Sequence, residues 1–186
     1  MMKIYSLILL SAAASLLCAA PLSDEQAIAK GSSASAALLQ KLGGEVKSNM
    51  QANGPVKTVE FCSNNALAMT DEISARTGTK ISRLTLKERN PLNTAKGVEK
   101  ALLEQWEQMV KNGQSLPAHE LKKLPDGKRV YYKPLLINNE ACLKCHGEIA
   151  YDSPLGKAIA STYPEDKAKG YKMGDLRGMI RVEMGE

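Results

Sequence analysis

The sequence predicts an α+β fold with long N-terminal helices and a small, mainly antiparallel sheet. Apolar residues recur every three or four positions through much of residues 24–77, which is the period of an amphipathic helix. Later segments have the two-residue alternation of strands. A parallel sheet would need a crossover helix between each strand and the next, and the sequence does not predict one between every pair. Hydrophobic residues make up 44% of the 186-residue chain, which excludes a disordered protein. We expect a single domain over residues 20–186.

The first nineteen residues have the layout of a secretory signal peptide. Lys3 gives a basic start, an apolar run covers residues 4–17, and small residues follow at 18–20. The run is short for a transmembrane helix, and no second apolar span follows it. Lipid attachment is the alternative, but Leu17 stands where a lipoprotein signal has a small residue. We expect residues 1–19 to be removed and the mature chain to be a soluble periplasmic protein.

Two helices are expected before the first strand. Ser23 and the two acidic residues after it form an N-cap signal, and an N-terminal helical arm is expected over about residues 24–52. Asn53-Gly54-Pro55 is a break whose proline suits the first turn of the next helix, and Gly78 ends that helix. Cys62 lies on the stripe expected to be buried. The two apolar stripes are Leu39, Leu42, Val46 and Met50, and then Val59, Cys62, Ala66, Met69 and Ile73.

Three strands and one more helix are expected after Gly78. The strands alternate between two faces, and the helix has apolar residues at helical spacing around Trp106. Pro134 has no amide hydrogen to donate, which indicates an edge strand or a strand end. The expected strands are 79–86, 129–137 and 175–184, and the helix is about 98–109. Residues 89–93 are expected to form a loop, residues 112–128 a loop with room for one helical turn, and residues 148–174 are expected to be mostly irregular.

The stretch CLKCHG, residues 142–147, carries the main chemical signal. Cys142 and Cys145 are two residues apart, and His146 follows directly. Two thiols at this spacing in a tight helical turn reach the two vinyl groups of a porphyrin, and the adjacent histidine reaches the iron. In an exported chain the pattern predicts one covalent haem c, with Cys142 and Cys145 as the thioether residues and His146 as the proximal ligand.

Two other sites can use the same residues. A thioredoxin-like dithiol needs a helix start after a buried strand in a parallel fold, and the predicted sheet is not parallel. A zinc site would combine Cys62, Cys142, Cys145 and a histidine. Zinc ligands usually come in two close pairs, whereas Cys62 is alone. Haem is therefore the favoured interpretation.

Residue counting leaves the second axial ligand of the iron open. His119 lies in a polar stretch and is expected to be solvated. Cys62 is the cysteine that haem attachment does not use, but a buried cysteine is commonly only a small hydrophobic residue. Methionine sulfur is the usual soft alternative, although Met69 and Met109 lie on stripes where core packing explains them. The methionine candidates are Met50, Met69, Met109, Met173, Met179 and Met184.

Four segments carry a resemblance that goes beyond the haem motif. They are VEFCSNNA around Cys62, ISRLTLKERNPLN at 81–93, YYKPLLINNEACLKCHG at 131–147 and YPEDKAKGYKMGDLRGMIRV at 163–182. Together they resemble a family of single-haem c-type proteins with a PAS-like fold, whose members occur as free exported proteins and as receptor sensor domains. The second and fourth segments make the resemblance specific. One departure is KGVE at residues 96–99, where the family tends to have a proline and an aromatic residue before the glutamate.

This resemblance implies a PAS-like sheet and a thiolate from Cys62 as the second axial ligand, opposite His146. A thiolate donates electron density to iron and favours the ferric state and a low potential. On reduction the iron–sulfur bond is expected to weaken, which would open a site for a small gas such as CO or NO. Haem propionates need cationic partners, for which Arg83 and Arg89 are the candidates. The alternative role for each arginine is a salt bridge at the surface or in a loop.

The sequence therefore predicts an exported single-haem cytochrome that acts in periplasmic electron transfer or redox chemistry. The second hypothesis is a haem-based redox or gas sensor, which is expected to act with a separate partner because these residues contain no recognised output domain. An enzyme such as a peroxidase would need an acid–base residue at an open distal site, and no distal histidine is found. The formal charge of +5 comes without a basic stripe of interleaved aromatics, so nucleic acid is not an expected partner. The redox partner is not given by the sequence.

Overall fold

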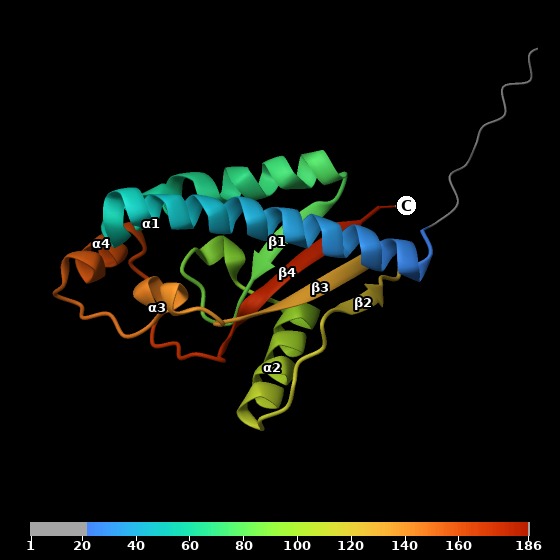
Figure 1. Cartoon of the computed structure of the whole chain (residues 1–186). Helices are drawn as coiled ribbons and strands as arrows, with labels where there is room; N and C mark the ends of the chain where they lie inside the picture. Colours follow the sequence, from blue (N-terminus) through green and yellow to red (C-terminus); the bar gives the residue numbers. More distant parts are fainter. Residues whose placement is uncertain (1–21, 186) are drawn as a thin grey trace, which may run out of the picture.

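The structure is a computed structural model and describes residues 22–185, so the predicted signal peptide lies outside it. A four-stranded antiparallel sheet has the strand order β1-β4-β3-β2. Helix α1 covers one face of the sheet, α2 packs on the other, and α3 and α4 lie beyond one end of the strands (Figure 1). The predicted α+β class with long N-terminal helices is confirmed. The elements are α1 (Asp24–Thr77), β1 (Lys80–Leu84), the 3-10 helix η1 (Pro91–Asn93), α2 (Gly97–Lys111), β2 (Glu120–Lys123), β3 (Arg129–Leu136), α3 (Glu140–His146), α4 (Pro154–Thr162) and β4 (Leu176–Met184).

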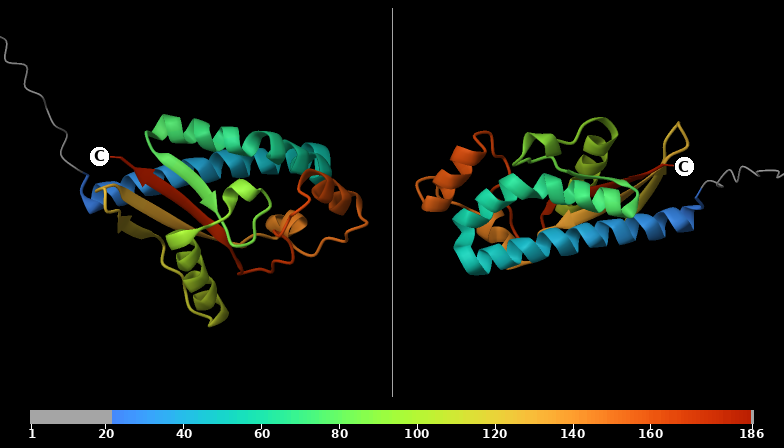
Figure 2. Two further views of the ribbon diagram at one scale, coloured as in Figure 1. Left: turned by 180° about the vertical axis from the view of Figure 1, so that it is seen from behind. Right: turned by 90° about the horizontal axis from the view of Figure 1, so that it is seen from above.

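Helix α1 is two helical halves joined at a sharp kink. It begins with a capping box, in which the Ser23 hydroxyl accepts from the Gln26 amide at 3.2 Å and the Gln26 side chain accepts from the Ser23 amide at 2.8 Å. Gly54, with φ 73° and ψ 179°, has a conformation that is essentially restricted to glycine. The halves fold back beside each other from this point (Figure 2). The predicted break at residues 53–55 is confirmed. Within residues 22–185, no helix has both the length and the apolar composition to cross a bilayer.

The two faces of the sheet have separate cores. On one face, α1 packs closely on the sheet because Gly31 lies against Tyr131, where any Cβ atom would come well inside van der Waals distance. On the other face, Trp106 of α2 packs beside Tyr132, and both are almost fully buried. Val98 is 59% exposed, so the predicted stripe of this helix contributes to the core only after its first turn.

Two predicted loops contain regular structure. Strand β2 lies within residues 112–128 and pairs antiparallel with β3, although its sequence ELKK has no apolar alternation. Helix α4 lies within residues 148–174, where Ser153 caps it by accepting from the Gly156 amide at 3.0 Å. The sequence did not predict β2 or α4 because both elements are short. Edge pairing stabilises the first, and local capping stabilises the second.

The position of Pro134 follows from the length of β2. Strand β3 lies inside the sheet, between β4 and β2. However, the pairing with β2 extends only from Arg129 to Tyr132, while Pro134 pairs with Met179 of β4. Pro134 therefore lies beyond the end of β2, where β3 has a neighbouring strand on one side only, as expected near a strand end.

Candidate functional site

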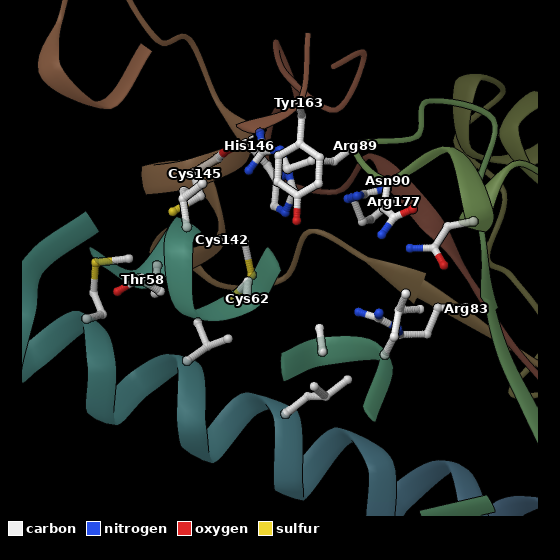
Figure 3. A pocket seen from close by; sticks show the side chains of 18 residues that line it. Thr58, Cys62, Arg83, Arg89, Asn90, Cys142, Cys145, His146, Tyr163 and Arg177 are labelled. Atoms are coloured by element: carbon white, nitrogen blue, oxygen red, sulfur yellow. Dashed lines mark hydrogen bonds between the residues drawn. The ribbon is translucent and has the colours of Figure 1, made fainter. Parts of the chain in front are cut away.

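A cavity of about 290 Å³ lies between the two halves of α1, α3 and the loop after β1. Side chains of Cys62, Cys142, Cys145 and His146 gather around this space, with Arg83 at another side of it (Figure 3). A second cavity of about 230 Å³ adjoins the first and shares several lining residues with it. The apolar part of the first cavity comes mainly from both halves of α1 and comprises Leu42, Val46, Met50, Val59, Ala66 and Leu67.

Helix α3 presents the residues of the predicted haem motif to the cavity. Asn139 begins this short helix by accepting from the Ala141 amide at 2.8 Å. Cys142, Cys145 and His146 all line the cavity, as their spacing within one helix predicts. Within residues 22–185, no cysteine forms a disulfide. The thiols that the haem prediction requires are therefore available on one wall.

Contacts of the His146 ring fix its tautomer. Nδ1 lies 2.8 Å from the carbonyl oxygen of Ala168, and since a carbonyl can only accept, Nδ1 carries the proton. Nε2 is then left with a lone pair, which is the arrangement of a histidine that ligates a metal. Desolvation, together with the charges of Arg177 and Arg89, lowers the pKa of the ring to about 3. His146 is therefore neutral at pH 7.

Cys62 reaches the same cavity from the second half of α1. Burial raises the pKa of its thiol, and Cys145 raises it further, whereas the charges of Arg83 and Arg89 lower it. Of the methionines that the sequence left open, only Met50 lines this cavity. Met69, Met179 and Met184 are buried in the protein core, Met109 of α2 packs against the core around Trp106, and Met173 is half exposed. His119 stacks on Tyr131, with ring centroids 5.3 Å apart.

The two tyrosines before the haem motif pack in the cores of the sheet. Tyr131 and Tyr132 belong to the cores on opposite faces of the sheet, and neither lines the cavity.

The zinc alternative needs a group of ligands close together. Among the side chains of residues 22–185, no group of three or more His, Cys, Asp or Glu is arranged to hold a metal ion. The zinc interpretation therefore lacks its ligand set in the described chain.

The two candidate arginines have different surroundings. Arg83 of β1 lines the cavity, and its guanidinium group forms no hydrogen bond or ion pair with any described residue. Burial lowers the pKa of its guanidinium group. Arg89 instead forms an ion pair with Asp166, in which Nε lies 3.1 Å from Oδ1. Arg83 can therefore receive an anion, while Arg89 already has one.

Arg177 is a third arginine in the site, and the sequence patterns assigned it no role. It comes from β4 and lines both cavities. Its Nη1 donates to the Thr85 hydroxyl at 3.0 Å and to the Lys87 carbonyl at 3.3 Å, and its guanidinium lies 5.4 Å from the centre of the Tyr171 ring. Arg177 stands in the fourth resembling segment, and its partners Thr85 and Lys87 lie some ninety residues earlier in the chain.

Comparisons with known proteins agree with this architecture. No curated protein matches the chain. The crystal structure of the cyanobacterial heme-protein Tll0287 is similar, with 23% sequence identity, a TM-score of 0.66, and coverage of 88% of this chain and 98% of that chain. This likeness concerns the fold. Residues 21–184 match the Tll0287-like family, so the family resemblance expected from the four segments is confirmed. The chain belongs to the Tll0287-like family.

Proposed function

We propose that this chain is an exported, single-haem c-type cytochrome, with Cys142 and Cys145 as thioether residues and His146 and Cys62 as axial ligands. The observation that carries the proposal is the convergence of these four side chains on one cavity, although Cys62 comes from α1 and the others from α3. The similar Tll0287 structure is described as that of a heme-protein, which supports the same cofactor here.

The residues around the cavity fit a haem. Both halves of α1 give apolar side chains that suit the macrocycle, and α3 gives the two thiols. The unpaired guanidinium of Arg83 suits a propionate carboxylate. When bound, the haem would supply a one-electron couple at its iron. We accordingly keep Arg83 as the propionate partner and assign Arg89 to its ion pair with Asp166.

Groups of the protein would set the protonation of the two proposed axial ligands, His146 and Cys62. The Ala168 carbonyl keeps the proton of His146 on Nδ1, so that Nε2 is the basic atom. Burial favours the protonated thiol at Cys62, while Arg83 and Arg89 favour the thiolate that a ligand must be. Deprotonation at Cys62 would therefore depend on the iron as well as on the two arginines.

Electron transfer and redox chemistry in the periplasm are the roles that we favour, with residues 1–19 as the export signal. A haem-based redox or gas sensor is the second candidate. Its specific support is the position of Cys62 on α1, because both halves of this helix line the cavity and also pack on the sheet. A change at the Cys62 sulfur would therefore act directly on the longest element of the fold.

Absorption and EPR spectra of the purified protein, oxidised and reduced, test the proposal. We expect covalently bound haem in the wild type, none in a Cys142→Ser/Cys145→Ser variant, and a ferric thiolate signature that Cys62→Ala abolishes. Met50→Leu is the matched control, because Met50 is the one candidate methionine that lines the cavity with Cys62. Loss of the ligand signature in Met50→Leu and not in Cys62→Ala would reject the Cys62 assignment. A wild type without haem would reject the whole proposal.

The same samples separate the two roles. Electron carriage predicts that the Cys62 ligand is retained on reduction and that the couple is reversible. Sensing predicts that the thiolate signature disappears on reduction and that the reduced protein then binds CO. The absorption spectrum of the reduced protein before and after CO addition distinguishes these outcomes.

A further inference from the structure

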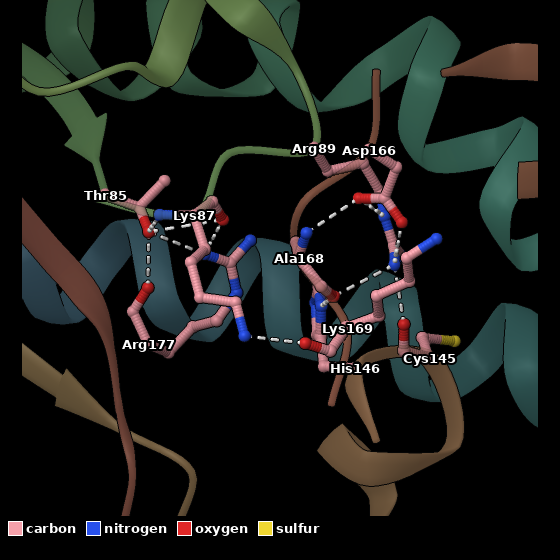
Figure 4. A network of polar contacts seen from close by, with 9 residues as sticks. All are labelled: Thr85, Lys87, Arg89, Cys145, His146, Asp166, Ala168, Lys169 and Arg177. Atoms are coloured by element: carbon pink, nitrogen blue, oxygen red, sulfur yellow. Dashed lines mark hydrogen bonds and ion pairs between the residues drawn. The ribbon is translucent and has the colours of Figure 1, made fainter. Parts of the chain in front are cut away.

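A compact set of hydrogen bonds connects His146 to Arg89 and Asp166 (Figure 4). Nε and Nη2 of Arg89 donate to Oδ1 and Oδ2 of Asp166 at 3.1 and 3.2 Å. The same Nη2 donates to the carbonyl oxygens of Cys145 at 2.7 Å and Ala168 at 3.2 Å. The Ala168 oxygen is also the acceptor for Nδ1 of His146, and the Ala168 amide donates back to Asp166 at 2.9 Å.

These contacts join three segments that are separate in the sequence. Arg89 comes from the loop after β1, Asp166 and Ala168 from the segment after α4, and His146 from the end of α3. Only 12% of the Arg89 side chain and 4% of the Asp166 side chain are exposed. A bidentate pair so well shielded from solvent has a well-defined geometry. The pair therefore fixes the distance between α3 and the segment after α4.

The end of α3 is held at several points by the same segment. The last carbonyls of a helix have no partners within the helix. Here the Cys145 carbonyl accepts from Arg89, and the His146 carbonyl accepts from the Tyr171 amide at 2.9 Å. The Gly147 carbonyl accepts from the Gly170 amide at 3.0 Å. With its backbone and its Nδ1 both held, the His146 ring has little freedom to rotate.

We infer that Arg89 and Asp166 are positioning residues for His146, acting on it through the carbonyl group of Ala168. The inference rests on the proposed function, because it concerns how His146 would meet the iron. It gives Arg89 a role other than propionate binding. The pair orients the carbonyl, the carbonyl sets the plane and tautomer of the ring, and the ring presents Nε2 to the cavity.

A purely electrostatic role makes a different prediction. Neutralising a nearby cation stabilises the ferric form, whereas neutralising a nearby anion stabilises the ferrous form. If charge alone mattered, neutralising Arg89 and neutralising Asp166 would shift the reduction potential of the haem in opposite directions. Arg89→Lys, which keeps the positive charge, would then have no effect. Positioning predicts the same defect in Arg89→Lys and Asp166→Asn, because both variants lose the two-pronged contact.

The test compares Arg89→Lys, Asp166→Asn and the wild type, all loaded with haem. Lys167→Gln is the matched control. Lys167 is next to Asp166 in the sequence, but its side chain is exposed and its ammonium group pairs with Glu88 at 2.7 Å. We expect a second set of low-spin ferric EPR signals in both test variants and one set in the control. We also expect denaturant to perturb the haem absorption before the far-UV circular dichroism in the test variants, while a merely structural role moves both transitions together.

Wild-type EPR spectra in both test variants would overturn the inference, as would potential shifts of opposite sign without new signals. If neither variant folds, amide hydrogen exchange in the wild type decides. The amides of Ala168, Gly170 and Tyr171 are then expected to exchange far more slowly than other loop amides between α4 and β4, and rapid exchange would overturn the inference. A wild type that carries no haem is a separate outcome, because it rejects the proposed function.

Discussion

Arg83 and Arg89 stand six positions apart in the sequence, yet their guanidinium groups meet different chemistry. Arg89 faces Asp166, a carboxylate from a distant segment that neutralises it in a shielded position. The guanidinium group of Arg83 faces the cavity and forms an ion pair with no described residue. A desolvated cation without a partner is costly, so its retention in a cavity wall supports an anionic ligand at that point. The sequence identified both arginines, but not the difference between them.

Tyr132 gives a prediction for alkaline pH. Its hydroxyl donates to Glu99 at 3.0 Å, and burial together with the Glu99 charge raises the pKa of Tyr132 to about 12. The folded state therefore favours the protonated phenol. The resulting stability is fully present below the unfolded pKa of about 10 and is lost as the pH rises through 12.

We expect the wild type to lose about 2 kcal/mol of unfolding free energy relative to Tyr132→Phe as the pH rises over this interval. Urea denaturation at several pH values measures the difference. Tyr151→Phe is the control, because it removes the hydroxyl of a tyrosine that is 76% exposed and lies outside both cores. Parallel pH profiles for the wild type and Tyr132→Phe would contradict the assignment.

Among the secondary-structure elements, α1 determines the shape of the cavity. Its first half packs on the sheet through small side chains, including Ala27 and Ala34, and then extends beyond the strands. There the stripe of Leu42, Val46 and Met50 faces the cavity and not the sheet. The apolar period of this helix was visible in the sequence. What its far end packs against depends on the kink at Gly54, which turns the second half back to complete the wall.

Substitution of Gly54 tests the kink. Gly54→Ala places a Cβ atom on a backbone with φ 73° and ψ 179°, and we expect it to cost about 1–3 kcal/mol of unfolding free energy. Gly44→Ala is the matched control. Gly44 is exposed within the helix and a Cβ atom there meets nothing within 4 Å, so alanine should stabilise by about 0.5–1 kcal/mol. Denaturation midpoints of the two variants check this, and shifts in the same direction would refute the role of Gly54.

On the scale of the whole molecule, the cavity and the sheet are separate regions. The two cores lie on opposite faces of the sheet, while the cavity walls come from α1, α3 and the loops beyond the strands. A haem in the cavity would contact the walls and leave the two cores largely untouched. Haem loading should therefore stabilise these walls more than the strands.

Hydrogen exchange of the haemless Cys142→Ser/Cys145→Ser variant tests this division. We expect faster exchange than in the wild type over about residues 42–67 and 140–147, with little change in β3 and β4, because only the former lose apolar contacts. Cys62→Ala, which should keep the covalent haem, is the control. A uniform increase over the whole chain would mean that the sheet also depends on the cofactor.

The sequence by itself determined the features that depend on near neighbours along the chain. The cap at Ser23, the break at Gly54 and the spacing of Cys142, Cys145 and His146 are local, because each involves residues within one or two helical turns. Strand alternation likewise predicted the antiparallel sheet. Short elements such as β2 and α4 were not predicted, because a few residues are too short a stretch to show a clear helical or strand period.

Only the tertiary structure decided which distant side chains meet. It brought Cys62 and Met50, from a longer set of candidates, to the cavity that His146 lines, and it paired Arg89 with Asp166 while leaving Arg83 facing that cavity. It also brought Arg177 to the site, where it bonds to Thr85 and Lys87 from the segment after β1. These outcomes depend on how the halves of α1 and the strands pack in three dimensions. Local periodicity states which face of an element is apolar, but not which residue that face will meet.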